Sequence, residues 1–413
     1  MGTAALRSPV GDKSMSFPEA ALLCWLVLSL LPHWVALGLA WSKFRQSRAS
    51  DRLPKPTSFP PVEVFVPVKG LSEDASEALR SLVEQTYPAY SVTFILESLD
   101  DPANSVVDRL CAGHPHAGKV ISGLSVSAAQ KNHNLVEGTK RLSPDTEILV
   151  FCDSTNAADP NWLVRFTEPI RSRAAEVVTT FRAFAPQPET IGGLCQAIYA
   201  AFVLVLATLH PMPWGGATGI RRETFERLEV ARAWSCTVVD DLVLGNVLAK
   251  AGLEVLMEPA EILRSPIKGQ TVGGFLSYLD RQILFPKWTH PDLWLQALFL
   301  HVNLTAATVV SVALMALSLA GFLGTVPGLT AGGFLCSLLA FALLLRRINP
   351  FSPSVGGWLI SLVPCMLLAA FVFIRSVFRD YIDWHGRRYW PGKDGIVLRI
   401  DALDHRNNGR SRP

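Results

Sequence analysis

The stretch 147–156, Glu-Ile-Leu-Val-Phe-Cys-Asp-Ser-Thr-Asn, decides how this chain of 413 residues folds. Its apolar run, Glu147 to Cys152, is short and ends directly at a carboxylate, which is typical of a buried strand that stops at a ligand-binding edge. Two further strands are predicted at Val62 to Val68 and Ser91 to Leu96, with a helix at Ala75 to Gln85 between them. Strands that alternate with helices indicate an α/β fold with a parallel sheet.

Acidic residues follow two of these predicted strands at the point where each strand ends. The second strand runs into Glu97, Asp100 and Asp101, and the third runs into Asp153. Because α/β sheets bind ligands at the carboxyl ends of their strands, we expect these carboxylates to share one edge. Such crowding is costly unless a cation answers it, and Mg²⁺ or Mn²⁺ with a nucleotide diphosphate would do so. The alternative is that the aspartates only begin loops or cap helices.

The second half of the charged region adds three candidate features. Residues 214–219 are a tryptophan followed by Gly-Gly-Ala-Thr-Gly, a run that lets the backbone approach a ligand closely. Asp240 and Asp241 begin an apolar helix, where a carboxylate either complements the helix dipole or accepts the proton of an alcohol nucleophile. Lys287 and Trp288 precede an apolar segment, so they are either interfacial anchors or a phosphate clamp beside a platform for a sugar.

Composition places part of the chain in a membrane. Charged residues make up 18% and apolar residues 49% of the chain, whereas soluble domains carry roughly 25% charged residues. Three stretches contain no Asp, Glu, Lys or Arg: Ala20 to Ser42, Leu293 to Leu345, and Ile348 to Ile374. A bilayer core needs ~20 apolar helical residues, so these stretches hold at most four spans. A fourth apolar stretch, Ile191 to Met212, is interpreted as an interfacial or core helix.

Charge and cysteine content narrow the class of protein further. The formal net charge of +3 is too small to indicate a nucleic-acid surface, so no nucleic-acid partner is expected. The seven cysteines show no paired spacing and predict neither a disulfide framework nor a zinc site. Lys43, Arg45, Arg48 and Arg52 follow the first apolar stretch, and the positive-inside rule therefore places the next domain in the cytoplasm. We expect a multi-pass integral membrane protein.

The predicted organisation has six parts. In chain order they are an N-terminal tail (1–19), a transmembrane anchor (20–42), a linker (43–61), a cytoplasmic α/β domain (62–292), C-terminal membrane segments (293–374) and a basic tail (375–413).

The side of the membrane on which the basic tail lies is open to two arguments. Three spans after the α/β domain would place the tail outside, whereas the arginines between Arg375 and Arg388 favour the cytoplasm. The tail stays in the cytoplasm if Ile348 to Ile374 does not cross the membrane but enters it and returns as a hairpin. Two glycines and Pro364 provide the bend for such a hairpin. We therefore predict a cytoplasmic tail in which Trp384 to Trp390 lies at the interface beside the α/β domain.

Eight short motifs occur in a fixed order over roughly residues 60 to 290. They are FVPVKG from Phe65, QTYPAY from Gln85, DDPA from Asp100, KNHNL from Lys131, FCDS from Phe151, GGATG from Gly215, VDDLVLG from Val239 and FPKW from Phe285. Together they resemble the ceramide glucosyltransferase family of inverting, membrane-bound glycosyltransferases. The resemblance implies a GT-A nucleotide-diphospho-sugar transferase domain with N-terminal and C-terminal transmembrane helices.

The resemblance also implies roles for individual residues. The catalytic base would be Asp241, with Asp240 beside it, and Mg²⁺ or Mn²⁺ would be held by Asp153. The donor-binding residues would be Glu97, Asp100, Asp101, Lys131, Asn134 and Asp153. The acceptor-binding residues would be Trp214, Lys287 and Trp288.

Two positions depart from the family pattern. Ser98 aligns with the family's first aspartate, so the role of that aspartate passes to Glu97 or Asp100. The family's final (Q/R)xxRW motif is here Leu-Phe-Pro-Lys-Trp, and Lys287 keeps the positive charge but lacks the bidentate fork of arginine.

The function that the resemblance implies is hexosyl transfer with inversion. We expect a UDP-sugar donor, UDP-glucose in the first place, and a membrane lipid acceptor such as ceramide, which would be attacked through its hydroxyl. One alternative is another lipid acceptor, such as a hopanoid or a polyprenyl phosphate. The other is a membrane scaffold that binds nucleotide without catalysis.

Overall fold

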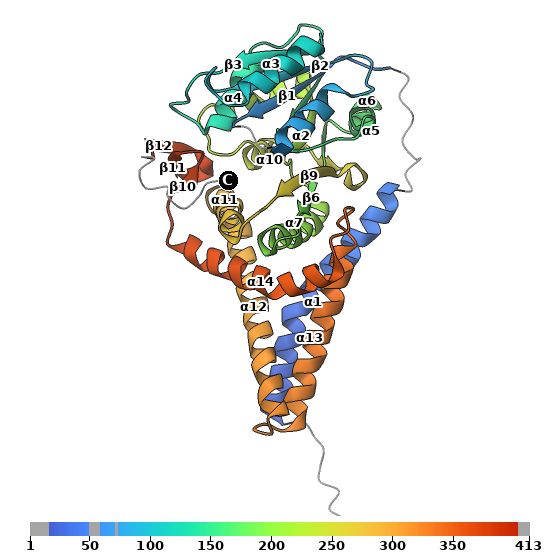
Figure 1. The fold of residues 1–413 in the computed structure, drawn as a ribbon, viewed down its shortest axis with the longest axis vertical. Coiled ribbons are helices and arrows are strands. Elements are labelled where there is room, and N and C mark those ends of the chain that lie inside the picture. The colour runs from blue at the N-terminus through green and yellow to red at the C-terminus, as the bar shows by residue number, and fades with distance from the viewer. Residues whose placement is uncertain (1–15, 49–57, 71–72, 404–413) are drawn as a thin grey trace, which may run out of the picture.

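The computed structural model describes residues 16–48, 58–70 and 73–403, and it shows an α/β domain standing on a bundle of long helices (Figure 1). Parts of the predicted tail 1–19, linker 43–61 and basic tail 375–413 lie outside the described residues.

A seven-stranded sheet forms the centre of the α/β domain, in the order β3-β2-β1-β4-β7-β5-β8. Strands β3, β2, β1 and β4 run parallel, whereas β7 is antiparallel to both of its neighbours. The three predicted strands are confirmed within one residue at each end. The strands are β1 (Val62–Val68), β2 (Tyr90–Leu96), β3 (Ala117–Ile121), β4 (Ile148–Cys152), β5 (Val177–Thr179), β7 (Ala217–Arg221) and β8 (Val255–Met257).

Helices cover both faces of this sheet, which explains why its central strands read as continuous apolar runs. One face packs against α2 (Glu73–Val83), α3 (Asn104–Gly113), α5 (Trp162–Phe166) and α6 (Glu168–Arg171). The other face packs against α4 (Gln130–Thr139), α8 (Arg222–Arg227), α9 (Val230–Trp234) and α10 (Asp241–Lys250). All five residues of β4 are buried, so Asp153 emerges at the edge of a fixed strand.

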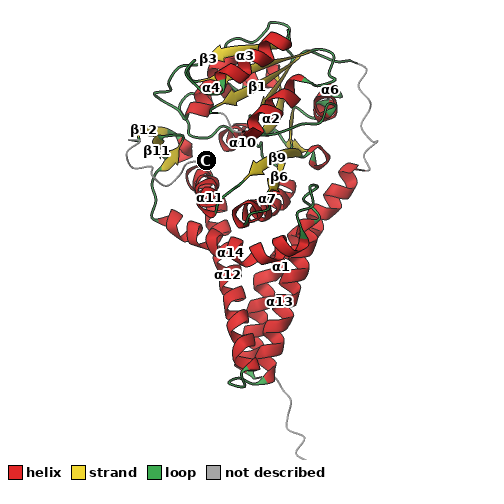
Figure 2. Ribbon diagram, in the orientation of Figure 1, coloured by secondary structure: helices red, strands yellow, loops and turns green. Residues whose placement is uncertain are grey.

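A second layer joins the sheet to the membrane bundle. It contains the parallel strands β6 (Arg182–Gln187) and β9 (Leu263–Lys268), with the helices α7 (Ile191–Leu209) and α11 (Val272–Thr289) below them (Figure 2). A short helix, η1 (Pro259–Glu261), precedes β9. Although α7 is long and apolar enough to cross a membrane, most of it is buried and it lies outside the bundle. This position agrees with its interpretation as a core or interfacial helix.

Three helices form the bundle: α1 (Phe17–Arg48), α12 (Pro291–Leu319) and α13 (Thr325–Arg346). Their side chains bond across the bundle, because the indole nitrogen of Trp25 donates to Asn303 at 2.9 Å and that of Trp34 donates to Ser337 at 3.0 Å. Among the described residues five helices are long and apolar enough to span a membrane, namely these three, α7 and α14 (Val355–Val377). These helices are candidate membrane spans.

The predicted hairpin within Ile348 to Ile374 is wrong. A single helix, α14, occupies this segment and runs crosswise where the bundle meets the α/β domain (Figure 1). The glycines fall in its first turn, which Ser354 caps by accepting a hydrogen bond from the Gly357 amide at 3.2 Å. Pro364 lies in the interior of this helix, and the thiol of Cys195 on α7 contacts the nearby Ser361 carbonyl.

After α14 the chain returns to the α/β domain and forms a three-stranded antiparallel sheet, which we call the C-terminal sheet. It consists of β10 (Ile382–Trp384), β11 (Arg387–Pro391), a short helix η2 (Lys393–Gly395) and β12 (Val397–Ala402). Backbone hydrogen bonds fix it to the domain, since the Val397 amide donates to Cys236 at 2.8 Å and the Val238 amide donates to Gly395 at 2.9 Å. The prediction that Trp384 to Trp390 lies beside the domain is confirmed.

Candidate active site

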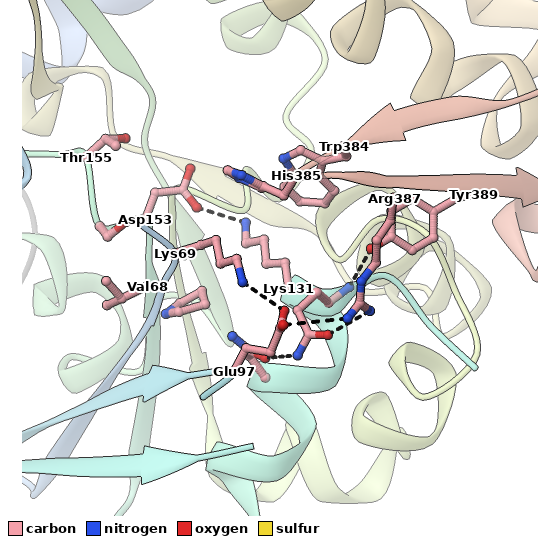
Figure 3. A pocket seen from close by; sticks show the side chains of 14 residues that line it. Val68, Lys69, Glu97, Lys131, Asp153, Thr155, Trp384, His385, Arg387 and Tyr389 are labelled. Carbon is pink, nitrogen blue, oxygen red and sulfur yellow. Dashed lines mark hydrogen bonds and ion pairs between the residues drawn. The ribbon is translucent and has the colours of Figure 1, made fainter. Parts of the chain in front are cut away.

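A cleft opens at the carboxyl ends of β1, β2 and β4, where the strand-end carboxylates were expected (Figure 3). Its walls come from the loops after these strands, from the first turns of α4, and from the C-terminal sheet. Four of the predicted site residues line the cleft, namely Glu97, Lys131, Asn134 and Asp153. Asp240 and Asp101 contact lining residues, because Asp240 pairs with Lys131 and Asp101 with Lys69.

Lys131 links the two halves of the site. Its ammonium group lies 2.9 Å from Asp153 and 3.1 Å from Asp240, and it donates to the Gly215 carbonyl at 3.0 Å. Burial alone would lower the pKa of Lys131, but the carboxylates of Asp153, Asp240 and Asp241 together raise it. Lys131 therefore stays charged and holds residues from three separate motifs around one point.

Any residue other than glycine at position 215 would force the charged side chains beside it to move. A methyl group added at its α-carbon would stand 2.4 Å from the Asp240 carboxylate and 2.7 Å from the Lys131 ammonium. The small-residue run that begins here thus allows the backbone to pass directly beside the charged cluster.

Asp241 occupies the first turn of α10, beside the buried Asp240. Its carboxylate accepts hydrogen bonds from the Gly215 amide at 3.0 Å and the Leu242 amide at 2.7 Å. Burial, with the neighbouring charge of Asp240, raises the pKa of Asp241 to about 6. A carboxylate with a pKa near the working pH is suited to accept a proton from a hydroxyl group.

The three acidic residues after β2 have different environments. Glu97 lines the cleft and forms an ion pair with Lys69 at 3.2 Å. Asp101 is buried and accepts hydrogen bonds from the amides of Gly70 and Ala103, so it fixes the loop after β1. Asp100 is exposed and contacts only the nearby Ser98 among the described residues. Of these residues, Glu97 is the one that faces the cleft.

Asn134 also lines the cleft, and its side chain makes three hydrogen bonds within the protein. It accepts hydrogen bonds from Ser122 and Gln130, both at 2.8 Å, and donates to the Ile95 carbonyl at 3.3 Å. Asn134 on α4 therefore bonds both to the end of β2 and to the residue that follows β3.

The C-terminal sheet supplies a wall of the cleft that the sequence did not predict. Trp384, His385, Arg387 and Tyr389 all line it, and Figure 3 shows them opposite Asp153 and Lys69. Arg387 lies 3.7 Å from Glu97 and donates to Gln130 at 3.0 Å. The C-terminal sheet is thus joined to the cleft by side chains as well as by backbone.

A tight turn brings His385 to the cleft. Trp384 and Arg387 pair across the turn, and the two residues between them, His385 and Gly386, both have positive φ, at 48° and 76°. Turns of this kind match the twist of a hairpin and favour glycine. Burial lowers the pKa of His385 to about 4, and the positive charges of Arg281 and Lys69 add to the effect. His385 is therefore neutral near pH 7.

The three predicted acceptor-binding residues do not lie together. Trp214 is near the charged cluster, where its ring packs on Phe181 with centroids 5.0 Å apart. Lys287 instead binds the end of α14, donating to the carbonyls of Ser376 at 2.9 Å and Arg379 at 2.7 Å. Trp288 lies beside Lys287, whose ammonium group is 5.3 Å from the ring.

Asp153 is the residue best placed to hold a divalent metal. The described residues contain no group of three or more His, Cys, Asp or Glu side chains that would form a complete protein cage. Mg²⁺ at nucleotide sites needs only one or two carboxylates, because substrate phosphates and water supply the other ligands. The Asp153 side chain is 26% exposed and faces the cleft, so it fits such a site.

Known proteins share this architecture. Among solved structures, the chain is similar to the mannosyltransferase PcManGT from Pyrobaculum calidifontis in complex with GDP-Man and Mn²⁺, with 20% identity, coverage of 86% of this chain and 99% of that chain, and a TM-score of 0.51. It also matches the 4-diphosphocytidyl-2C-methyl-D-erythritol synthase from Anaerococcus prevotii at 11% identity over 54% of this chain and 97% of that chain, with a TM-score of 0.35. The first likeness confirms the GT-A fold, whereas the second is too distant to use.

The family comparison covers most of the chain. The family model described as Glycosyl transferase family 21 matches residues 28–397, which include the bundle, the α/β domain and most of the C-terminal sheet. The match agrees with the motifs that resemble ceramide glucosyltransferases. The chain is thus a glycosyltransferase, and it belongs to glycosyl transferase family 21.

Proposed function

We propose that the protein transfers glucose from UDP-glucose, with inversion, onto a hydroxyl group of a membrane lipid such as ceramide. One observation carries this proposal: Gly215 donates its amide proton to Asp241 and accepts a hydrogen bond from Lys131, which contacts Asp153. A candidate base and a candidate donor-binding carboxylate are therefore held on either side of one residue.

The reaction needs a single displacement. The acceptor oxygen forms a bond to the anomeric carbon while its proton passes to a carboxylate oxygen of Asp241. The bond between the anomeric carbon and the phosphate oxygen breaks, and its electron pair leaves with the nucleoside diphosphate. Because one displacement occurs on the face opposite the leaving group, the configuration at the anomeric carbon is inverted.

The donor would occupy the cleft between the strand ends and the C-terminal sheet. Glu97 and Asn134 line the cleft, and we assign the nucleoside to them. Asp153 would hold Mg²⁺ or Mn²⁺, which supplies positive charge to the diphosphate when bound. Support for this metal comes from PcManGT, whose structure contains GDP-Man and Mn²⁺.

The position of the site above the helices supports a lipid acceptor. The layer of β6, β9, α7 and α11 separates the charged cluster from the bundle, and its apolar core is continuous with that of α1, α12, α13 and α14. An acceptor with a lipid tail can therefore approach from the bilayer while the donor enters from water. We assign the donor side to the cytoplasm, because Lys43 and Arg45 end the first bundle helix on the side of the α/β domain.

The test is transfer by the purified full-length chain in lipid-supplemented detergent. UDP-glucose, UDP-galactose and GDP-mannose would each be offered with ceramide, a hopanoid or a polyprenyl phosphate, with and without EDTA. We expect a glucosylated ceramide of inverted configuration, formed only when the metal is present. Product from another donor or acceptor would overturn the assigned substrates, and nucleotide binding without any turnover would overturn catalysis.

A further inference from the structure

Arg182, at the first position of β6, is a charged residue enclosed by aromatic rings. Its guanidinium carbon lies 4.7 Å from the ring centre of Phe184, 5.3 Å from that of Trp214 and 5.5 Å from that of Tyr278. The side chain is only 12% exposed. These rings orient a guanidinium through cation–π contact, but they accept none of its hydrogen bonds in the plane of the fork.

The hydrogen-bonding capacity of Arg182 is unused. Among the described residues its one ionic contact is with Asp153, at 3.9 Å, which is too long for a hydrogen bond, and its Nε atom is buried without a partner. Arginine stays charged and presents five donors in a fixed planar fork. A buried charge without hydrogen bonds is costly, so an anionic ligand would relieve the cost.

Arg171 also has a buried Nε without a partner, but it differs from Arg182 in its terminal nitrogens. Its guanidinium carbon also lies over two rings, at 4.6 Å from Phe59 and 5.7 Å from Tyr87. However, its terminal nitrogens donate to the carbonyls of Val164 at 2.8 Å and Ser58 at 3.3 Å. The terminal nitrogens of Arg182 have no such acceptors among the described residues.

Positive charge accumulates around Arg182. Burial lowers the pKa of Arg281 on α11, and the charge of Arg182 lowers it further, which places two guanidinium groups within electrostatic range of each other. Arg281 in turn acts on His385 in the cleft wall. Arg182 and Arg281 therefore both contribute positive charge between Asp153 and α11.

We propose that Arg182 binds a phosphate oxyanion of a substrate, on the side of Asp153 that faces α11. The phosphate has two candidate sources. The first is the departing diphosphate of the donor, and for this source the inference rests on the proposed function. The other source is a phosphate on the lipid acceptor, because the aromatic cage belongs to the apolar core that includes α7 and α11. In both cases the planar fork makes two hydrogen bonds to phosphate oxygens.

The first arm of the test uses inorganic pyrophosphate with Mg²⁺, so it depends on neither the sugar nor the nucleotide base. Binding to the purified full-length chain would be measured by calorimetry for the wild type, Arg182→Lys, Arg182→Met and the matched control Arg171→Met. If the donor is the source, we expect Arg182→Met to weaken binding about tenfold or more, since a hydrogen bond to a charged group is worth ~1.5 to 3 kcal/mol. The pyrophosphate affinity of Arg182→Lys should lie between those of the wild type and Arg182→Met, and the control Arg171→Met should bind pyrophosphate as the wild type does.

The second arm measures the KM for the acceptor with ceramide and with polyprenyl phosphate. If the acceptor phosphate is the source, pyrophosphate binding is unchanged, and Arg182→Met raises the KM for the phosphorylated lipid alone. The inference is overturned if both measurements match the wild type and only the melting temperature falls. Wild-type binding of pyrophosphate without glucosyl transfer would instead overturn the proposed function and leave the role of Arg182 standing.

Discussion

The carboxylates of Asp153, Asp240 and Asp241 surround the Lys131 ammonium group, and they do not all contact it directly. Asp153 and Asp240 contact Lys131 directly, whereas Asp241 interacts with it at longer range and is held by backbone amides. Lys131 therefore compensates the first two charges more fully than the third. Burial and the neighbouring charge of Asp240 raise the pKa of Asp241 to about 6, and the charge of Lys131 offsets only part of this rise.

Asp241→Asn should remove transfer and leave donor binding intact, because the amide has nearly the same shape but cannot accept the proton. Loss of a general base costs ~10² to 10⁴ in rate. The measurement is kcat for glucolipid formation together with UDP binding. Asp100→Asn is the control, since Asp100 is exposed and does not line the cleft. Turnover near the wild-type level in Asp241→Asn would reassign the base.

The rate should fall as the pH is lowered through about 6. The base works only as a carboxylate, so protonation of Asp241 below its raised pKa removes activity about tenfold per pH unit. The charge of Asp240 is one cause of the raised value, and Asp240→Asn should therefore move the acid limb of the profile to lower pH. A pH–kcat profile that is flat from pH 5 to 8 would show that Asp241 does not supply the limiting ionisation.

Asp153→Ala should weaken donor affinity and the dependence on metal together. The change removes the one carboxylate at the end of β4 that faces the cleft, and the diphosphate loses the cation that Asp153 would hold. The measurement is the KM for UDP-glucose across a Mn²⁺ titration, with Asp159→Ala, an exposed carboxylate six residues later, as control. If Asp153→Ala kept the metal requirement of the wild type, another residue would have to be the ligand.

The family resemblance named the residues of the charged cluster, and the structure brings Lys131, Asp153, Asp240 and Asp241 together. The sequence did not separate Glu97 from Asp100, since that choice depends on how one loop turns after β2. It also did not show that Lys287 caps α14, because the cap requires knowledge of where a helix 90 residues later ends. Arg182 belongs to none of the motifs, and only three-dimensional packing shows that its guanidinium group makes no hydrogen bond to a described residue.

The C-terminal sheet is held by arginines that the sequence had suggested were topology signals. Arg379 contacts Asp280 of α11 at 3.0 Å and Asp383 of β10 at 3.1 Å, and Arg388 binds Asp383 through two hydrogen bonds. Arg375 also pairs with Asp280. These ion pairs join α11, α14 and the C-terminal sheet, so the basic character of this segment is used for assembly of the cleft wall.

Arg387→Ala should raise the KM for the donor about fivefold to tenfold with a smaller effect on kcat. The variant removes the link to Glu97 and Gln130, and a charged hydrogen bond of this kind is worth ~1.5 kcal/mol or somewhat less when partly exposed. Arg399→Ala is the matched control on the same sheet, because Arg399 is largely exposed and pairs with Asp401 away from the cleft. Equal KM values for both variants would separate the C-terminal sheet from donor binding.

The C-terminal sheet and the crosswise course of α14 could not be predicted from the sequence, for a physical reason. The strands β10 and β11 are short and rich in charge, and their pairing depends on a turn in which His385 adopts positive φ, which is uncommon for a residue other than glycine. The crosswise course of α14 depends on packing against α7 and α11, because its length and apolar composition alone equally suit a span. The bundle helices and the central sheet had stronger local signals.

The arrangement of the whole molecule predicts which regions share a side of the membrane. Val126 and Leu398 are exposed on the α/β domain and the C-terminal sheet, whereas Phe322 is exposed in the turn at the far end of the bundle. Cysteines introduced at the first two positions should react with an impermeant maleimide from the same side of sealed vesicles. A cysteine at Phe322 should react only from the other side, measured above the background of the native cysteines.

Joint labelling of positions 398 and 322 from one side would contradict this arrangement. It would mean that α14 crosses the bilayer and that the C-terminal sheet does not pack on the α/β domain in the membrane.

The place of the cleft wall in the chain sets an order on biosynthesis. Trp384, His385 and Arg387 leave the ribosome only after α12, α13 and α14 have been made. A nascent glycosyltransferase with a complete central sheet therefore still lacks one side of its cleft until its bundle has entered the bilayer. A chain stalled before residue 380 has the carboxylates at the strand ends but not the side chains that complete the cleft.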